Sequence, residues 1–510
     1  AGLAEMAWVD GRDVWAHDLL DAAACTVCAA AGVAGLDALR ALDDRALCAA
    51  LWRSVPCRPV DAEFPLFIIY TSGSTGKPKG VVHVHGGYVA GVAHTMAVAF
   101  DALPGRDVAY VVADPGWITG QSYLITAALA ARIPGIVTEG APVFPNAGRF
   151  ASIIERHRVT IFKAGVTFLK TVMAHPENRA DVERYDRSSL RVATFCAEPT
   201  SPAVQAFGMA VMTPQYINSY WATEHGGIVW THPYGNPDLR LRADARTYPL
   251  PWVMGDVWVA EGAPDADGRV AHRPAEPEEK GEIVVTAPYP YLARTIWGDA
   301  ARVGAADWKG DVERFARTYF GRFRDPDGRP VWAYLQGDFA RRYADGAFSL
   351  HGRSDDVINV SGHRMGTEEI EGAILRDKQV NPDSPVGNVI VVGAPHREKG
   401  LTPVAFVLPA TGRALTGDDE RRLKELVRQE KGAVAVPSDI VVVPAFPETR
   451  SGKYMRRFLT AMMNDEPLGD TSTLRNPDCL PALRTRIEAW KRGQRRAEEQ
   501  RLLEIGRAHV

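Results

Sequence analysis

Short apolar runs alternate with helical segments along most of the chain. Four apolar runs of strand length lie at residues 64–69, 106–115, 131–140 and 158–165. Residues 122–130 and 149–156 have the character of helices. This alternation predicts an α/β fold whose layers contain largely parallel sheets. The Pro-, Gly- and Asp-rich segment 260–281 is expected to be a loop or hairpin insert.

A second unit begins near Asp355. Its pattern predicts a helix, two strands, a second helix and a third strand, at residues 367–376, 388–393, 403–408, 418–431 and 439–443. Such a unit is a small α+β domain. We therefore expect a large domain over residues 1–354, a small domain over 355–470 and a helical tail over 471–510. The tail is charged, and its pattern is equally typical of a linker to a following domain and of a solvated surface helix.

Composition narrows the class of protein. The 59 basic and 62 acidic residues give a net charge of −3, so we expect neither a nucleic-acid nor a membrane partner. Six scattered cysteines in 510 residues fit a reducing compartment, and we expect a cytoplasmic protein. The most apolar Ala-rich stretch, residues 22–36, is too short to span a bilayer, and no signal peptide is visible.

The most informative motif is YTSGSTGKPKG at residues 70–80, which follows an apolar strand-like run. Its glycines let the backbone fold tightly, so that N–H groups can point at an anion, while hydroxyls and lysines add donors and charge. The pattern predicts a polyphosphate-binding loop formed by Thr71, Ser72, Gly73, Ser74, Thr75, Gly76 and Lys77. It is not the common P-loop, because Pro78 stands where that motif needs Ser or Thr.

Further motifs follow in a fixed order along nearly the whole chain. They are GRDVWAHDL (11–19), ADPGWITGQSY (113–123), EGAPVFPNAGRF (139–150), SYWATEHGG (219–227), GDFARRYADG (337–346), GRSDDVINVSGHRMGTEEIE (352–371) and TRSGKYMRR (449–457). Together they resemble the adenylate-forming enzymes, and within them the short-chain acyl-CoA synthetases of the acetyl-CoA synthetase type. The resemblance implies a large multi-sheet adenylation domain followed by a small, mobile α+β lid domain. It also implies ATP, Mg²⁺ and coenzyme A as cofactors.

The resemblance implies roles for residues of the adenylation step. Lys453 corresponds to the catalytic lysine, and Glu224, after Thr223, to the magnesium-associated glutamate. Asp338 is expected to accept hydrogen bonds from the ribose hydroxyls. The other implied nucleotide contacts are Ala197, Glu198, Pro199, Asn218, Ser219, Tyr220, Trp221, Ala222, Arg353 and Arg364. Two positions depart from the family pattern, since Ala197 stands in place of a usual Gly and Asn218 in place of a usual Asp.

The resemblance also implies an acyl pocket and a coenzyme A site. Trp221 would close the pocket for very short chains, and its walls would be Trp117, Ile118, Thr119 and Cys196. The implied coenzyme A contacts are Thr119, Ser361 and Arg428, and Asp355 corresponds to the hinge of the small domain. Gln121 and Ala222 replace a usual His and Gln, so we expect a pocket that differs from one for acetate.

These motifs predict an ATP-dependent ligase that converts 3-hydroxypropionate or propionate into acyl-AMP and then acyl-CoA. The runs INSYWATEHGGIVW and GAPHREKGLTP are most similar to the ligase part of propionyl-CoA synthase, which implies fusion to downstream hydratase and reductase domains. Acetyl-CoA synthetase, a carrier-protein-loading domain and an inactive nucleotide-binding fragment are the alternatives. We expect the large domain to be incomplete at its N-terminus and residues 504–510 to be non-native.

Overall fold

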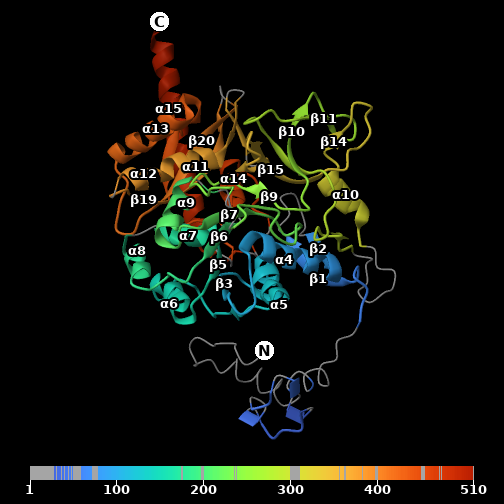
Figure 1. Cartoon of the computed structure of the whole chain (residues 1–510). Coiled ribbons are helices and arrows are strands. Elements are labelled where there is room, and N and C mark those ends of the chain that lie inside the picture. The colour runs from blue at the N-terminus through green and yellow to red at the C-terminus, as the bar shows by residue number, and fades with distance from the viewer. Residues whose placement is uncertain are drawn as a thin grey trace.

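The structure is a computed structural model. It describes residues 28–29, 31–35, 37–38, 41–43, 45–46, 49, 59–71, 79–173, 176–196, 200, 202–234, 236, 238–298, 310–354, 357–360, 363–381, 383–396, 400–449, 454–469, 471 and 474–508. Its overall arrangement is mixed α/β, with a large N-terminal part and a small C-terminal domain (Figure 1). No helix in these residues has the length and apolar character needed to cross a bilayer.

The large part is organised around a seven-stranded sheet with the strand order β4-β3-β5-β6-β7-β8-β9. Its parallel portion consists of β3 (Ala109–Val111), β4 (Gly135–Ile136), β5 (Ile161–Gly165), β6 (Val192–Cys196) and β7 (Tyr216–Tyr220). The antiparallel strands β8 (Trp230–Thr231) and β9 (Tyr248–Pro249) extend it. The predicted strand runs 106–115, 131–140 and 158–165 contain β3, β4 and β5, so these predictions are confirmed.

Helices cover both faces of this sheet (Figure 1). One core cluster joins the sheet to α4 (His85–Phe100), η1 (Gly120–Ala127) and α5 (Ala128–Ala131). The other joins it to α6 (Gly148–His157), α7 (Val166–Met173), α8 (Pro176–Glu183) and α9 (Pro202–Val211). Successive strand residues alternate between the faces, because side chains along a strand point to opposite sides. Ile161 therefore lies in the first cluster and Phe162 in the second.

The expectation of largely parallel sheets is wrong outside the central sheet. A three-stranded antiparallel sheet contains β1 (Pro65–Thr71), β2 (Lys79–Val84) and β13 (Thr295–Ile296). A six-stranded sheet has the order β14-β11-β10-β12-β15-β16 and a single parallel pair, β11 with β14. Its strands are β10 (Gly255–Glu261), β11 (Val270–Pro274), β12 (Lys280–Val285), β14 (Phe323–Arg324), β15 (Tyr334–Arg342) and β16 (Phe348–Arg353). The antiparallel pairs β10–β11 and β15–β16 join strands that are consecutive in the chain and linked by short connections, which suit antiparallel pairing.

The small domain is a five-stranded sheet with helices on both faces. Its strands are β17 (Val357–Val360), β18 (His363–Gly366), β19 (Val386–His396), β20 (Gly400–Pro409) and β21 (Asp439–Val442). One cluster contains residues of α11 (Thr367–Leu375) and α13 (Gly417–Lys431), and the other those of α14 (Arg456–Met463) and α15 (Cys479–Ala508). The remaining helices are α10 (Val312–Phe320), α12 (Asp377–Val380) and η2 (Ala433–Ala435). The division at residues 354/355 and 470/471 stays a prediction.

The predicted C-terminal helix is present as α15, and its first turns belong to the small domain's core. Cys479, Leu483 and Ile487 are buried against strand residues of β19 and β20. The charged part of the helix extends away from the domain, at the top of Figure 1. The start of α15 is therefore part of the packed domain.

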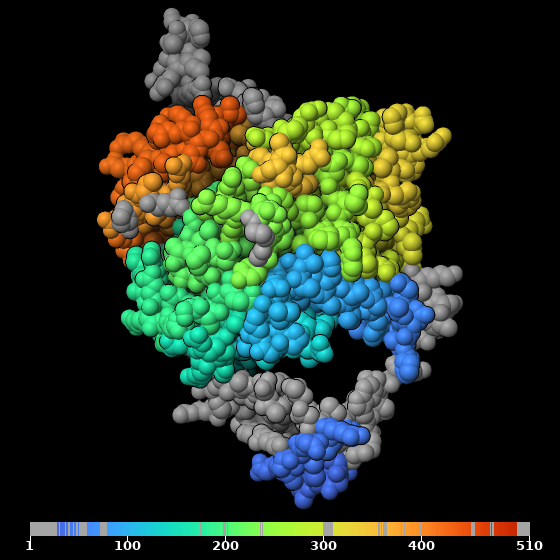
Figure 2. All heavy atoms as spheres, in the orientation of Figure 1, coloured from blue at the N-terminus to red at the C-terminus, as the bar shows by residue number. Residues whose placement is uncertain are grey.

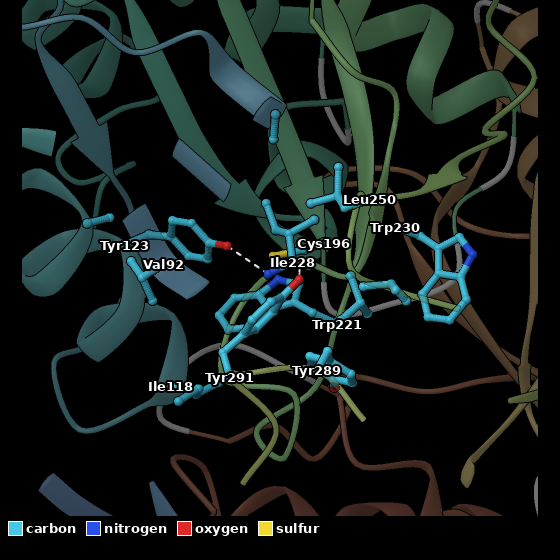
Figure 3. Close-up of a cluster of buried hydrophobic side chains, with 14 of the residues drawn as sticks. Val92, Ile118, Tyr123, Cys196, Trp221, Ile228, Trp230, Leu250, Tyr289 and Tyr291 are labelled. Atoms are coloured by element: carbon cyan, nitrogen blue, oxygen red, sulfur yellow. Dashed lines mark hydrogen bonds between the residues drawn. The ribbon is translucent and has the colours of Figure 1, made fainter. Parts of the chain in front are cut away.

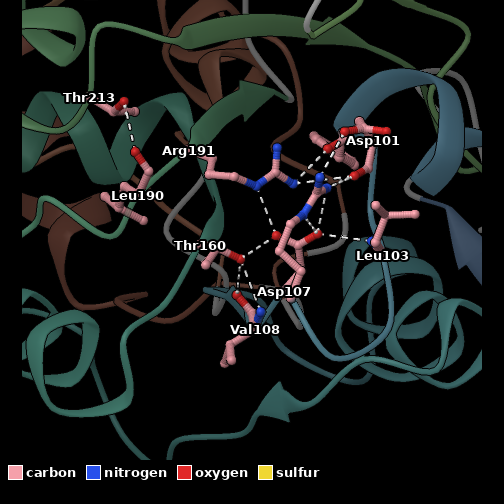
Figure 4. A network of polar contacts seen from close by, with 10 residues as sticks. Asp101, Leu103, Asp107, Val108, Thr160, Leu190, Arg191 and Thr213 are labelled. Atoms are coloured by element: carbon pink, nitrogen blue, oxygen red, sulfur yellow. Dashed lines mark hydrogen bonds and ion pairs between the residues drawn. The ribbon is translucent and has the colours of Figure 1, made fainter.

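A buried ion-pair network fixes the start of the parallel sheet (Figure 4). The side chain of Asp107, just before β3, is fully buried and accepts hydrogen bonds from Arg106 (2.8 Å), Arg191 (2.9 Å), Thr160 (2.8 Å) and the Leu103 amide (2.9 Å). Burial raises the pKa of Asp107, but the hydrogen bonds from the arginines outweigh it and lower this pKa below its usual value. The network joins segments that precede β3, β5 and β6.

The two parts of the molecule meet along β12, β16 and α11. In Figure 2 the small domain, in orange and red, lies directly against the green segments of the large part. Lys280 of β12 forms an ion pair with Glu369 of α11 (3.1 Å), and His351 of β16 approaches the same carboxylate (3.6 Å). Burial raises the pKa of the neighbouring Glu368 to about 8. Charged groups from both parts therefore meet at this interface.

Candidate active site

Predicted site residues gather around the carboxyl end of β7, at the edge where parallel α/β sheets place their ligands. Tyr220 ends the strand, and Trp221 to Glu224 follow it directly. Asp338 of β15 and Arg353 of β16 are register partners across these two strands. Both lie in the same region as the end of β7, because the side chain of Tyr220 contacts Asp338. Segments more than a hundred residues apart in the chain are thereby brought together.

Asp338, Tyr220 and Arg353 form one polar cluster. The Tyr220 hydroxyl donates a hydrogen bond to Asp338 Oδ2 (2.6 Å), and Arg353 Nη1 lies 3.9 Å from Asp338 Oδ1. Arg353 Nη1 also donates to the Gln336 carbonyl (2.7 Å). Burial, and then the charge of Asp338, raises the pKa of Tyr220 well above its usual value, so the phenol stays protonated. Three residues that the sequence assigned to the nucleotide therefore contact one another.

Glu224 is a buried carboxylate held by two side chains that sequence reasoning missed. It is 4% exposed, accepts a hydrogen bond from the Tyr319 hydroxyl and accepts a second from Gln336 Nε2 (3.2 Å). Lys79 Nζ lies 5.0 Å from the centre of the Tyr319 ring. Burial lowers the pKa of Lys79, and the charge of Glu224 opposes this shift. A carboxylate and an ammonium group thus face a common polar region.

The loop before Glu224 is fixed by two buried histidines. His83 Nε2 donates to the Thr223 carbonyl (2.8 Å), and the Ala222 amide donates to His225 Nδ1 (3.0 Å). Burial lowers the pKa of His83 to about 4 and that of His225 to about 3. Both rings are therefore neutral near pH 7, as an acceptor role for His225 Nδ1 requires.

The predicted phosphate loop connects two paired strands. Thr71 ends β1 and is the register partner of Lys79, which begins β2. Thr71 Oγ1 is buried and has no hydrogen-bond partner in the described part of the chain. A buried hydroxyl of this kind is suited to a ligand oxygen. Many predicted residues lie outside the described residues, namely Ser72, Gly73, Ser74, Thr75, Gly76, Lys77, Ala197, Glu198, Pro199, Asp355, Ser361 and Lys453.

Three of the five residues assigned to the acyl pocket belong to one core cluster. Ile118 (6% exposed), Cys196 (2%) and Trp221 (7%) share one core cluster with Tyr123, whose ring meets Trp221 edge-on at 5.1 Å (Figure 3). Trp117 and Thr119 are half-buried and directly precede the helix η1. Trp221 is thus enclosed by aromatic and aliphatic side chains, as the floor of a small pocket requires.

The structure gives the surroundings of four further assigned residues but no ligand contact for any of them. Asn218 is 4% exposed, and its amide donates to the Ala245 carbonyl (2.8 Å). The Ser219 hydroxyl donates to the Phe195 carbonyl (2.9 Å), so it is engaged inside the sheet. Arg428 is exposed on α13, where it pairs with Glu425 (2.9 Å). Arg364 lies in β18 opposite Asn359. Their ligand contacts stay predictions.

One buried cation in this region was missed entirely. Lys163 of β5 is 1% exposed, and its ammonium group lies over the rings of Tyr123 (4.8 Å) and Trp221 (5.3 Å). The available signal was a lysine inside the apolar run IFKAG, which forms a central strand. Gln121, expected near the pocket, instead donates to the Pro115 carbonyl (2.6 Å).

Family models match the same regions. The model described as AMP-binding enzyme matches residues 12–297, more than half of the chain, and the AMP-binding enzyme C-terminal domain matches residues 369–453. The chain belongs to the AMP-binding enzyme family. This assignment agrees with the two-part α/β architecture and with the resemblance seen in the sequence motifs.

Curated relatives of this AMP-binding family protein are acetyl-coenzyme A synthetases. The protein of Xanthobacter autotrophicus is 39% identical over 433 residues, which cover 84% of this chain and 60% of that protein. The protein of Chromobacterium violaceum is 36% identical over 486 residues, covering 93% and 64%. The chain thus spans less than two thirds of the length of these relatives.

Solved structures support the same fold. An anthranilate CoA ligase in complex with anthranoyl-AMP matches with a TM-score of 0.64 and 20% identity, over 80% of this chain and 69% of that one. Acetoacetyl-CoA synthetase from Streptomyces lividans matches with a TM-score of 0.66 and 22% identity, over 84% and 60%. At these identities the likeness concerns the fold of the AMP-binding family.

Proposed function

We propose that this protein is an AMP-forming acyl-CoA synthetase for a short-chain carboxylate. It joins the acid to ATP, forming acyl-AMP and pyrophosphate, and then transfers the acyl group to coenzyme A, releasing AMP. The observation that carries the proposal is the convergence of Asp338, Tyr220, Arg353 and Glu224 beside the enclosed Trp221 pocket. This arrangement supports a nucleotide site that adjoins an acyl site.

The residues have distinct roles in this proposal. Asp338 accepts hydrogen bonds from the ribose hydroxyls, and the guanidinium of Arg353 adds positive charge near the nucleotide. The hydroxyl of Thr71 and the ammonium of Lys79 face the phosphates. Joining two anions requires positive charge where negative charge develops, and Lys453 supplies it at the α-phosphate. Trp221 limits the length of the acyl chain.

Magnesium and coenzyme A fit residues of this chain. Glu224 and the hydroxyl of Thr223 offer oxygen atoms, which hard cations such as Mg²⁺ prefer. When bound, the ion supplies charge neutralisation for the phosphates. Arg428 is exposed on α13, so it can pair with a phosphate of coenzyme A, and Thr119 and Ser361 complete that assignment. Asp355 and Arg364 are assigned to the hinge and to the nucleotide.

The test separates the two half-reactions. Lys453→Ala is expected to abolish carboxylate-dependent exchange of pyrophosphate into ATP, while a supplied acyl-adenylate is still converted to thioester. Lys424→Ala, on a surface helix of the small domain, is the matched control and should leave exchange unchanged. Unchanged exchange in the Lys453 variant would contradict its catalytic assignment. Absence of exchange with every acid in the unmodified chain would contradict the proposed activity.

The acyl group is a finer part of the proposal. The names of the curated relatives favour acetate. The departures at Gln121 and Ala222 favour a three-carbon acid, 3-hydroxypropionate or propionate, although Gln121 is engaged with Pro115. Exchange rates with acetate, propionate, 3-hydroxypropionate and butyrate decide between them. Preference for acetate over both three-carbon acids contradicts the finer assignment.

Other classes of function predict different results. A domain that loads a carrier-protein thiol forms acyl-AMP but releases no acyl-CoA. An inactive nucleotide-binding fragment binds ATP without pyrophosphate exchange. The further proposal of fusion to hydratase and reductase domains rests on the similarity of the sequence runs to propionyl-CoA synthase. The complete reading frame of the gene tests it, because those domains would be encoded after the small domain.

A further inference from the structure

Lys163 is an ammonium group without a counter-charge in a closed environment. It lies in the middle of β5, a strand of the parallel sheet, and is 1% exposed. In the described part of the chain no carboxylate forms an ion pair with it. Buried lysines are rare unless they are paired, because removing the charge from water is costly. A lysine at this position therefore points to a partner other than the described residues of the chain.

The groups around Lys163 leave part of its hydrogen-bonding capacity unused. Its Nζ donates to Ser219 Oγ at 3.3 Å, a long hydrogen bond. Ser219 Oγ also accepts from Thr194 Oγ1 (3.0 Å) and donates to the Phe195 carbonyl (2.9 Å), so it is fully engaged. Cys196 offers only a sulfur atom, which is a weak acceptor. An ammonium group has three N–H donors, and an oxygen atom of a ligand could take those that remain.

The position of Lys163 in the sheet assigns it to the closed end of the pocket. It faces the same side of the sheet as Ile161, toward η1 and its Tyr123. It precedes the end of β5 by two residues, whereas the nucleotide residues lie at and beyond the ends of strands. Its ammonium group lies over Trp221, the predicted floor. A substrate group that meets Lys163 would therefore lie deeper in the proposed acyl pocket than the residues at the ends of the strands.

We propose that Lys163 recognises an oxygen substituent on the acyl carbon farthest from the reacting carboxylate. The substrate class is thus a two- or three-carbon acid with a distal hydroxyl or carboxylate group. This inference rests on the proposed function, because it takes the acyl pocket as its setting. It differs from the earlier expectation in naming a buried cation as the recognising group, where Gln121 and Ala222 had been considered.

Two ligand groups share this chemistry and make different demands on Lys163. A distal carboxylate would form a buried ion pair with the ammonium. A distal hydroxyl would accept one hydrogen bond and leave the amine neutral or charged. Burial lowers the pKa of Lys163, which favours the hydroxyl because a neutral amine can also accept a hydrogen bond from it. A site that bonds a hydroxyl rejects an analogue without it by roughly 10⁴-fold.

The first experiment uses the unmodified full chain. Binding of 3-hydroxypropionate, malonate and propionate is measured by calorimetry with a non-hydrolysable ATP analogue present. We expect at least one oxygenated acid to bind more tightly than propionate by on the order of 100-fold or more. The better of 3-hydroxypropionate and malonate identifies the distal group as hydroxyl or carboxylate. Propionate binding as tightly as both oxygenated acids would overturn the proposal without any variant.

The second experiment compares Lys163→Met with Lys170→Met. Methionine keeps length and apolar volume but removes the donor, and Lys170 lies on the neighbouring α7. We expect Lys163→Met to reverse the preference toward propionate, and Lys170→Met to keep it. An equal loss for all three acids would mean that Lys163 only supports the packing of the two rings, which also overturns the proposal. If Lys163→Met does not fold, the wild-type ratio decides.

The two proposals can fail separately. Lys163-dependent binding of an oxygenated acid without any pyrophosphate exchange would contradict the proposed adenylation and leave the recognition by Lys163 standing. Exchange that is supported equally by propionate and the oxygenated acids would leave the adenylation standing and remove Lys163 from recognition.

Discussion

Replacing Trp221 with Gly tests whether one side chain sets the length of the acyl group. The indole is 7% exposed and meets Tyr123 edge-on at 5.1 Å. The side chains of Ile118 and Cys196 lie in the same cluster (Figure 3). Removing the ring leaves a space lined by apolar side chains and by the ammonium group of Lys163, which lies over the indole. Acids with longer chains are expected to fill that space.

The expected magnitudes follow from burial. Truncating a buried Trp costs about 3–5 kcal/mol of folding stability. Each methylene that a longer acid buries contributes about 0.8 kcal/mol. Butyrate has two methylenes more than acetate, so it gains about 1.6 kcal/mol, or roughly 15-fold, in the enlarged pocket. In the proposed site the indole excludes butyrate from the unmodified pocket by steric overlap, and on that proposal the ratio of the two acids should change by more than this factor.

The assay is kcat/KM for pyrophosphate exchange with acetate, propionate, butyrate and hexanoate. Trp258→Gly is the matched control, because Trp258 is equally buried (8% exposed) but lies in a separate cluster of the six-stranded sheet. The control should lose comparable stability and keep the chain-length preference. If Trp221→Gly loses activity with all acids in parallel and gains none with butyrate, Trp221 is a core residue and not the floor of the pocket.

Further predictions concern stability and regulation. Asp107→Asn removes a buried charge partner of two arginines and should cost about 3–5 kcal/mol, measured by urea unfolding, whereas Asp186→Asn in an exposed ion pair should cost much less. Equal small losses would contradict the importance of the network. His83 and His225 have pKa values lowered by burial to about 4 and about 3, while the unfolded chain binds these protons near pH 6.5. As the pH falls from 6.5 toward the folded pKa of each ring, the free energy of unfolding should therefore fall by up to about 1.4 kcal/mol per pH unit for that ring. A free energy of unfolding that stays constant over pH 4–6.5 would refute this. Acetylation of Lys453 should stop adenylation by removing its charge, and full activity at complete acetylation, quantified by mass spectrometry, would oppose that assignment.

Local patterns in the sequence predicted the elements well. The helix expected over residues 418–431 is α13 at Gly417–Lys431, and its start carries a capping box between Thr416 and Asp419. The strand expected over 439–443 is β21 at Asp439–Val442. These elements follow from hydrophobic periodicity and end signals, which depend on neighbours within a few residues. Glu224 and Asp338 could be selected without a structure because the motifs that contain them resemble those of the adenylate-forming enzymes.

Pairing between distant segments could not be predicted in this way. The apolar runs gave strands, but they did not reveal that β1 and β2 pair in a separate antiparallel sheet. Tyr319 contacts Glu224 from 95 residues away, and Lys163 reaches Ser219 across 56 residues. No local signal links such partners, because the free energy of these contacts arises only after the sheets and helices have packed.

The sequence by itself determined the two-part architecture, the phosphate-loop motif and the family to which the chain is similar. The tertiary structure decided which polar groups share one site, and which charge is left without a partner. Lys163 illustrates the difference. In the sequence it is one of many lysines, whereas in the fold it is enclosed with Trp221 and lacks a carboxylate partner among the described residues. Burial and charge compensation are properties of the packed chain, because they depend on every segment that surrounds a group.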